Sequence, residues 1–326
     1  MKRTERKKIT ILGQQINPGQ KRILHLDIAR LHTHTKLEIP VIVERAKEDG
    51  PVLLLNAGIH GNELNGVEIV RDLLVKKYTK PEKGMVICIP TLNVFGFLNQ
   101  TREFPDGKDL NRSFPGSKNG SLASIFAFHM MNEIVPHIDY CIDFHTGGAQ
   151  RFNTSQIRIS KNDPELLELA KVFNPRFIVY AGQRDKSFRQ AAADKGKKVL
   201  LFEGGKSLDF KQRITQRGVY GTLKLMQHLG MRDFTDETEK IKEHIKINGS
   251  VLIQKSVWLR AKYAGLYRFF IKDGSKVEKN DIIGSISDPY GKFESKIKVP
   301  QSGYVIGLNH SPVVYKGDAI VNLGLE

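Results

Sequence analysis

The chain has 326 residues, of which 40% are hydrophobic and 26% are charged, so it can bury a large core and is not a disordered protein. The formal net charge is +16, but the basic residues are spread along the chain. There is no helix-turn-helix, zinc-finger spacing or aromatic–basic interleaving, which argues against a nucleic-acid-binding protein. No apolar run approaches the roughly 18 residues of a membrane span.

The two cysteines, Cys88 and Cys141, stand in apolar strand-like runs. Buried thiols without a local partner fit a reducing compartment better than a disulfide framework. The basic N-terminus is not followed by an apolar segment of signal-peptide length. We therefore expect a cytoplasmic protein with no membrane partner.

The N-terminal part of the chain is predicted to form strands that then alternate with helices. Residues 37–44 alternate apolar and polar side chains, and Pro40 favours an edge strand because proline has no N–H to donate. Buried strands and amphipathic helices joined by short loops predict an α/β sheet with helices on both faces. The expected elements are strands at 9–13, 21–30, 37–44 and 51–55, a helix at 66–78 and a strand at 84–90.

A glycine-rich turn, residues 56–63, follows a buried strand and carries His60 and Glu63. This spacing lets an imidazole and a carboxylate converge on one cation, as in catalytic zinc sites with two histidines and one glutamate. Gly58 and Gly61 let the backbone turn sharply. The pair alone is a weak signal, because most such pairs lie on protein surfaces.

A second histidine pair, His32 and His34, is a weaker metal candidate. No acidic or cysteine partner stands near it in the sequence. We interpret it as an ordinary strand-end sequence.

Residues 93–116 show no regular pattern and carry Arg102, Asn111 and Arg112. Loops of this length inside a compact domain are usually functional. These three side chains are therefore candidates for binding or catalysis.

Two further strands end in residues suited to chemistry. The strand at 138–148 carries His145 beside two glycines, a good position for a ligand, although a polar strand end is the simpler interpretation. The strand at 198–202 is followed by Glu203 and two glycines. A carboxylate there is poorly solvated and suits proton transfer near neutral pH.

The rest of the chain changes character twice. Residues 236–249 are charged and linker-like, and after residue 250 short strands separated by glycine turns predict a small all-β barrel or sandwich. The other expected elements are helices at 121–135, capped by Ser121, and at 208–229, and strands at 155–160 and 176–181.

Four stretches, taken in order, resemble the succinylglutamate desuccinylase/aspartoacylase family of the zinc carboxypeptidase-like superfamily. They are residues 58–63 (Gly-Ile-His-Gly-Asn-Glu), 109–116 (Asp-Leu-Asn-Arg-Ser-Phe-Pro-Gly), 143–147 (Asp-Phe-His-Thr-Gly) and 202–205 (Phe-Glu-Gly-Gly). Four motifs in the correct order are specific. The resemblance implies an α/β fold with a carboxypeptidase-like mixed sheet flanked by helices.

The resemblance also implies a metal site. His60, Glu63 and His145 would hold one zinc ion per chain, with the fourth position left for water. Asp109 matches the carboxylate that orients a ligand histidine, here His60. Asp143 is a rival for that role, because it alternates onto the same side of its strand as His145.

The remaining motif residues acquire catalytic and binding roles from the same resemblance. Glu203 would carry the proton from water to the leaving amine, and Arg102 would face the oxyanion. Asn111 and Arg112 would bind a substrate carboxylate, which the fork of arginine suits. Four arginines are open candidates for a second carboxylate contact: Arg151, Arg158, Arg184 and Arg189.

The C-terminal part resembles the biotinyl/lipoyl-like barrel of some family members, through residues 273–284. Lys292 lacks the flanking residues that modification enzymes expect, so a structural or oligomer-contact role is favoured over lipoylation. We expect a zinc-dependent hydrolase domain at 1–235, a linker at 236–249 and a β-barrel domain at 250–326.

The predicted function is hydrolysis of the amide bond of an N-acylated amino acid or a similar small carboxylate. The first alternative is a metallocarboxypeptidase or cell-wall peptidase, which would use the same zinc chemistry. The alternative of another class is a non-catalytic metal-binding regulatory module, against which the intact Glu203 and Arg102 argue. The sequence leaves the acyl group, the amino acid and a homo-oligomeric state open.

Overall fold

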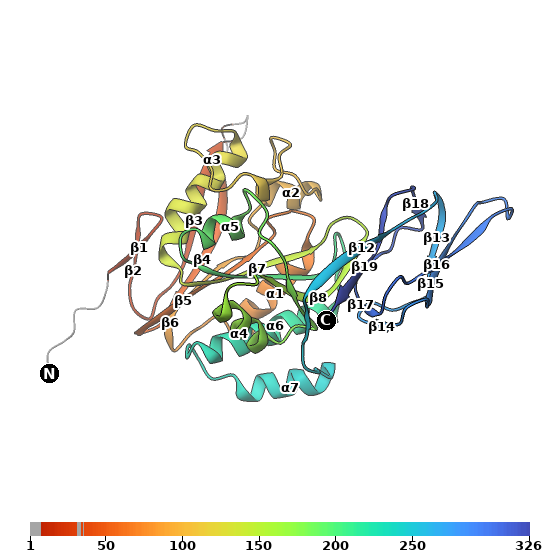
Figure 1. The fold of residues 1–326 in the computed structure, drawn as a ribbon. Coiled ribbons are helices and arrows are strands. Elements are labelled where there is room, and N and C mark those ends of the chain that lie inside the picture. Colours follow the sequence, from red (N-terminus) through yellow and green to blue (C-terminus); the bar gives the residue numbers. More distant parts are fainter. Residues whose placement is uncertain (1–7, 31–33, 35) are drawn as a thin grey trace.

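The computed structural model describes residues 8–30, 34 and 36–326, which fold around one large mixed sheet (Figure 1). Along its main path the strand order is β12-β19-β17-β8-β10-β7-β5-β6-β4-β3. Within the described residues this sheet has 13 strands: β3 (Lys21–Arg30), β4 (Lys36–Arg45), β5 (Glu48–Ala57), β6 (Lys83–Ile89), β7 (Tyr140–Gly147), β8 (Arg151–Ile159), β9 (Phe177–Tyr180), β10 (Lys198–Lys206), β11 (Val251–Ile253), β12 (Lys255–Arg260), β14 (Lys276–Val277), β17 (Gly303–Asn309) and β19 (Ala319–Leu325).

The centre of the sheet is parallel. β6, β5, β7 and β10 run in the same direction, and β4 and β8 add antiparallel neighbours on either side. Successive apolar side chains point to opposite faces, so Leu53 and Leu55 of β5 pack into one core and Leu54 into the other. This double burial explains why the central strands are continuous apolar runs in the sequence.

Helices cover both faces of the sheet (Figure 1). The core that contains Leu53 and Leu55 is closed by α1 (Leu64–Val75), α4 (Pro164–Phe173), α6 (Gln212–His228) and α7 (Thr235–Ile245). The opposite core is closed by α3 (Leu122–His129), by α5 (Phe188–Ala193) and by the hairpin of β1 (Ile9–Ile11) and β2 (Gln14–Ile16). The protein is therefore a mixed α/β fold, as predicted.

Several elements differ from their predicted limits. The helix expected at 121–135 is α-helical only to His129, and continues as a π turn (Met130–Ile134) and a 3-10 turn (Val135–His137). Ser121 stands at its N-cap without a side-chain capping bond. The loop at 93–116 contains α2 (Val94–Asn99) and a 3-10 turn (Leu110–Arg112), and α4 was not predicted at all.

The segment predicted as a linker, 236–249, is mostly helix. Thr238 of α7 is buried, and Ile241 packs against the core that α6 also covers. Its many charged residues lie on the exposed side of the helix, which is why the sequence resembles a linker.

Pro40 does not mark an edge strand. β4 lies between β6 and β3, and β3 is the outer strand. The pairing of β4 with β6 is confined to Ile42–Arg45, whereas Pro40 pairs with His25 of β3. Proline is tolerated there because β4 has a paired neighbour on only one side at this position.

The chain after residue 250 is all-β, and part of it extends the central sheet. β17 pairs with β8, and β12, β14 and β19 continue outward from β17 (Figure 1). A second sheet has the order β16-β15-β13-β18 and contains β13 (Gly265–Phe269), β15 (Ile282–Ser287), β16 (Glu294–Lys298) and β18 (Val313–Val314). The two sheets enclose a core of their own, which includes Tyr267, Ile283 and Val321.

No helix in the described ranges is both long and apolar enough to cross a membrane. His32 lies outside the described residues, so the proposed pairing of His32 with His34 is not tested.

Candidate active site

Neighbouring parallel strands bring separate motifs of the chain to one edge of the sheet. β5 and β7 are paired as far as Ala57 and Phe144, so the turn after β5 lies beside His145. Glu203 of β10 is the register partner of His145. In open sheets of this kind, ligands bind at the carboxyl ends of the strands.

The turn between β5 and α1 has room only for glycine at two positions. Gly58 has a φ of +65°, and a Cβ on it would lie 3.0 Å from the Cα of Thr91. A Cβ on Gly61 would lie 1.8 Å from the backbone carbon of Gly96 in α2. The close contact between this turn and α2 therefore fixes the direction in which His60 points.

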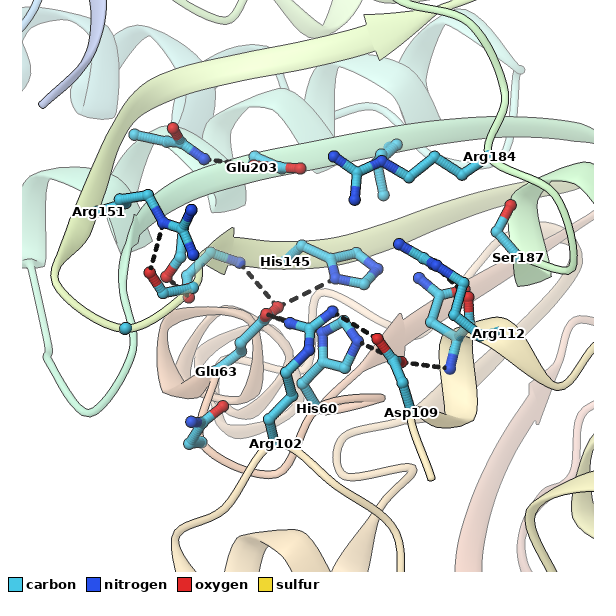
Figure 2. A pocket seen from close by; sticks show the side chains of 18 of the residues that line it. His60, Glu63, Arg102, Asp109, Arg112, His145, Arg151, Arg184, Ser187 and Glu203 are labelled. Carbon is cyan, nitrogen blue, oxygen red and sulfur yellow. Dashed lines mark hydrogen bonds and ion pairs between the residues drawn. The ribbon is translucent and has the colours of Figure 1, made fainter. Parts of the chain in front are cut away.

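The imidazoles of His60 and His145 turn their Nδ1 atoms toward the carboxylate of Glu63 (Figure 2). The Nδ1–oxygen distances are 2.7 Å for His60 and 3.0 Å for His145. One ligand atom from each residue lies within 4.8 Å of the others, and all three residues are buried. Burial alone would raise the pKa of Glu63, but the two imidazoles outweigh it and hold the pKa well below its usual value. Two imidazole nitrogens and an ionised carboxylate, buried together, are a donor set that fits zinc.

Each histidine is held from behind by a carboxylate. The Nε2 of His60 lies 3.1 Å from Asp109 Oδ1, and the Nε2 of His145 lies 3.0 Å from Asp143 Oδ2. Asp143 also accepts a hydrogen bond of 2.7 Å from the amide of Asn56. The two aspartates that appear as rivals in the sequence thus each contact a different histidine, an arrangement that fixes the rings of metal ligands.

Arg102 lies against the same cluster. Its Nη1 donates to Glu63 Oε1 at 3.2 Å and its Nη2 to Asp109 Oδ2 at 2.9 Å. The guanidinium is therefore fixed at both ends beside the three converging ligand atoms. A positive charge held in this way is well placed to stabilise negative charge that develops there.

Asn111 and Arg112 lie on the 3-10 turn at the other side of the cluster. Asn111 is buried, and its Oδ1 accepts a hydrogen bond of 2.9 Å from Phe188 N, which directs the amide nitrogen elsewhere. Arg112 bonds the carbonyl of Asn111 through Nη1 and points toward the pocket (Figure 2). Both residues therefore offer N–H donors to a ligand.

Glu203 is half-buried and held by two side chains of β8. Asn153 donates its amide to Oε2, and Arg158 Nη1 lies 3.3 Å from Oε1. Each carboxylate oxygen of Glu203 thus has its own partner on the neighbouring strand.

These residues line one cavity of about 900 Å³. This volume suits a small molecule rather than a folded partner. The wall includes Trp258 of β12, which is the chain's only tryptophan. Six arginines line the cavity beside four carboxylates. The arginines are Arg102, Arg112, Arg151, Arg158, Arg184 and Arg189, and the carboxylates are Glu63, Glu103, Asp109 and Glu203.

Comparison with known families decides the affiliation of the chain. The succinylglutamate desuccinylase/aspartoacylase catalytic domain matches residues 49–229, which is more than half of the sequence. The chain belongs to this family. The family domain contains the strands and turns that carry His60, His145 and Glu203, and it ends before the all-β C-terminal region.

Individual relatives of the family cover most of the chain. The N-alpha-acetyl-L-2,4-diaminobutyric acid deacetylase of Halomonas elongata is 27% identical over an alignment of 267 residues, and the match covers 77% of this chain and 74% of that protein. A succinylglutamate desuccinylase/aspartoacylase from Rhodobacter sphaeroides has a TM-score of 0.80 at 24% identity and covers 94% of this chain and 95% of its own. The product-bound ectoine utilization protein EutE (DoeB) from Ruegeria pomeroyi has a TM-score of 0.80 at 21% identity, over 96% of this chain and 100% of its own. These structures share the α/β fold.

The predicted site residues of this family member all lie in the one cavity. They are His60, Glu63, Arg102, Asp109, Asn111, Arg112, His145 and Glu203. Of the open arginine candidates, Arg158 is paired with Glu203, and Arg189 donates to the carbonyls of Arg158 and Gly182 at 3.1 and 2.8 Å.

Asn153 and Trp258 are among the cavity residues that were missed in the sequence. Asn153 belongs to no sequence motif. Its contact with Glu203 arises from the pairing of two strands, which a local sequence pattern does not reveal. Trp258 lies in the C-terminal region, and no local pattern indicates that its strand reaches the cavity.

Proposed function

We propose that this family member is a zinc-dependent hydrolase that cleaves the amide bond of an N-acylated amino acid or a similar small carboxylate. The observation that carries the proposal is the convergence of His60, Glu63 and His145 beside Arg102 and Glu203 in a single cavity. The relative from Halomonas elongata, a deacetylase of an acetylated amino acid, supports the same reaction class.

His60, Glu63 and His145 would hold the zinc ion, with Asp109 and Asp143 fixing the two histidine rings. When bound there, zinc supplies Lewis acidity that activates water and polarises the scissile carbonyl. The inward direction of both Nδ1 atoms and the depressed pKa of Glu63 keep these donors available for a cation.

The remaining residues act on the substrate itself. Asn111 and Arg112 bind its carboxylate through N–H donors and so place the amide over the cluster. Arg102 stabilises the oxygen that gains negative charge when water attacks the carbonyl carbon. Glu203 takes a proton from the attacking water and returns it to the nitrogen of the leaving amine, which completes the cleavage.

The protein's organisation is proposed in the same sense. Residues 1–235 form the hydrolase unit, 236–249 connect it to the C-terminal region, and 250–326 form a biotinyl/lipoyl-like β unit with a structural role. Cys88 and Cys141 are free and buried, and thiols that form no disulfide support a reducing compartment such as the cytoplasm.

The proposal is tested by following primary-amine release from N-acetyl and N-succinyl amino acids and from short peptides. We expect release from acyl amino acids, and a loss of about 10²–10⁴-fold in kcat for Glu203→Gln, the range for a removed acid–base group. Glu68→Gln, on the outer face of α1, is the matched control and keeps wild-type rates.

Other outcomes would assign the protein differently. Release from peptides alone would make it a metallopeptidase. No release from either substrate, with zinc bound, would favour the non-catalytic metal-binding module.

A further inference from the structure

Glu203 is the proposed proton carrier, and its carboxylate is held more completely than its motif suggests. Asn153 contacts Oε2 and Arg158 contacts Oε1 at 3.3 Å, so both oxygens are occupied from one side. The side chain of Glu203 is 14% exposed and that of Arg158 is 20% exposed. A proton carrier must aim at the attacking water and at the leaving amine, so its orientation is part of its efficiency.

Asn153 and Arg158 both come from β8, although their spacing in the sequence predicts that their side chains lie on opposite faces of the strand. Residues 153 and 158 are five positions apart, which places side chains on opposite faces of a regular strand. The pairing of β8 with β10 shifts register between Glu203 and Gly205. This irregularity turns Asn153 to the side of the sheet where Arg158 already lies, a common use of such bulges beside active sites.

The C-terminal region supports the Asn153 end of β8 from its other edge, whereas Arg158 lies opposite Val179 of β9 on that edge. β17 pairs with β8 through Gly307 opposite Asn153 and Leu308 opposite Phe152. The amide of Gln156 donates to the carbonyl of Ile306 at 3.3 Å. The Asn153 end of β8 is therefore fixed between β10, which carries Glu203, and β17 of the C-terminal region.

Gly307 leaves little space for a side chain beside Asn153. A Cβ on Gly307 would lie 3.0 Å from Asn153 Oδ1 and 3.2 Å from the Cβ of Asn322. Asn153 is only 3% exposed and has little room to move away. The backbone of β17 thus forms the wall against which the side chain of Asn153 is pressed.

We propose that Asn153 and Arg158 are positioning residues for Glu203, and that β17 of the C-terminal region keeps Asn153 in place through Gly307. The proposal rests on the proposed role of Glu203 in proton transfer. It makes the C-terminal region a part of the catalytic apparatus, although β17 itself does not contact the reacting atoms.

The test uses the full-length zinc-loaded protein and compares kcat and KM for the best acyl amino acid. Arg158→Gln and Asn153→Ala are expected to lower kcat about tenfold to a hundredfold, while KM changes by less than about twofold. Arg158→Lys keeps the positive charge and is expected to recover part of kcat. Arg260→Gln, in an exposed part of β12, is the matched control.

Gly307→Ala tests the support from the C-terminal region. We expect kcat to fall about threefold to tenfold without a change in bound zinc, since displacement of a positioning side chain misplaces Glu203. Gly249→Ala is the matched control, because a Cβ there meets no atom within 4 Å. Thermal unfolding midpoints of all variants separate a local effect from a loss of fold.

The decisive comparison repeats the substitutions in the Glu203→Gln background. If Arg158 and Gly307 act through Glu203, substituting either of them lowers the residual rate of Glu203→Gln by less than about twofold. An undiminished loss in this background, or a rise in KM at constant kcat, would overturn the proposal and make Arg158 a substrate contact. Failure of the proposed function itself looks different, because the unmodified enzyme or Glu203→Gln would then already give the contrary result.

Discussion

The two sides of the cavity are built in different ways. The metal-ligand side is deeply buried, and its contacts run between motif residues: His60 with Glu63 and Asp109, and His145 with Glu63. On the side proposed for proton transfer, Glu203 is half-buried and contacts Asn153 and Arg158 of β8, whose Asn153 end pairs with the C-terminal region.

Under the proposed function, the two halves of the reaction are secured in different ways. A metal site needs ligand atoms at fixed distances, and a short turn plus a strand end can supply them locally. A proton carrier needs its direction set, and here that comes from long-range sheet pairing. Loss of metal should therefore follow changes near residues 56–63 and 143–147 and at Asp109, whereas loss of rate with metal retained should follow changes in β8 and β17.

The largest effect is expected from the metal side. His145→Ala removes one of three protein ligands, so we expect loss of bound zinc and a fall in kcat of about a thousandfold or more, because the metal's stabilisation of the transition state amounts to several kcal/mol. Metal analysis of the purified variant and amine-release assays provide the measurement. Retention of one zinc per chain would break the contrast between the two sides.

The second effect concerns the carboxylates behind the histidines. Asp143→Asn and Asp109→Asn should weaken zinc affinity by about tenfold to a hundredfold, the range for groups that orient metal ligands. Asp143 should show the larger loss, because it is fully buried while the Asp109 side chain is 25% exposed. Competition with a chromophoric chelator measures both affinities, and equal losses would show that burial does not separate the two contacts.

The smallest effect on catalysis is expected from Trp258, the residue of the C-terminal region that lines the cavity. Trp258→Leu should raise KM about threefold to tenfold with little change in kcat, since it removes apolar contact area but no reacting group. In the unmodified protein, binding of substrate or product should change tryptophan fluorescence, because Trp258 is the chain's only tryptophan. Unchanged fluorescence at saturating substrate would place the ligand away from Trp258.

Much of the proposed metal-ligand side was predictable because its residues lie close together in the sequence. His60 and Glu63 are three residues apart, and Asp143 and His145 two apart, so their shared direction follows from one turn and one strand. The parallel order of β5, β7 and β10 then brings these strand ends together, as the alternating strands and helices indicated.

The rest could not be inferred for physical reasons. The contact of Asn153 with Glu203 depends on a register irregularity, which leaves no trace in apolar periodicity. Trp258 reaches the cavity only because β12, β19 and β17 continue the central sheet beyond β8. In α7, the charged outer face concealed a helix whose inner residues are few, and the sequence therefore suggested a linker.

The most direct test of the central claim measures zinc content and amine release on the same protein sample. We predict about one zinc per chain, release of amine from N-acetyl amino acids, loss of that release after chelation, and recovery on addition of one equivalent of zinc. Hydrolysis that persists in metal-free protein would contradict the account, because His60, Glu63 and His145 would then have no catalytic role as metal ligands.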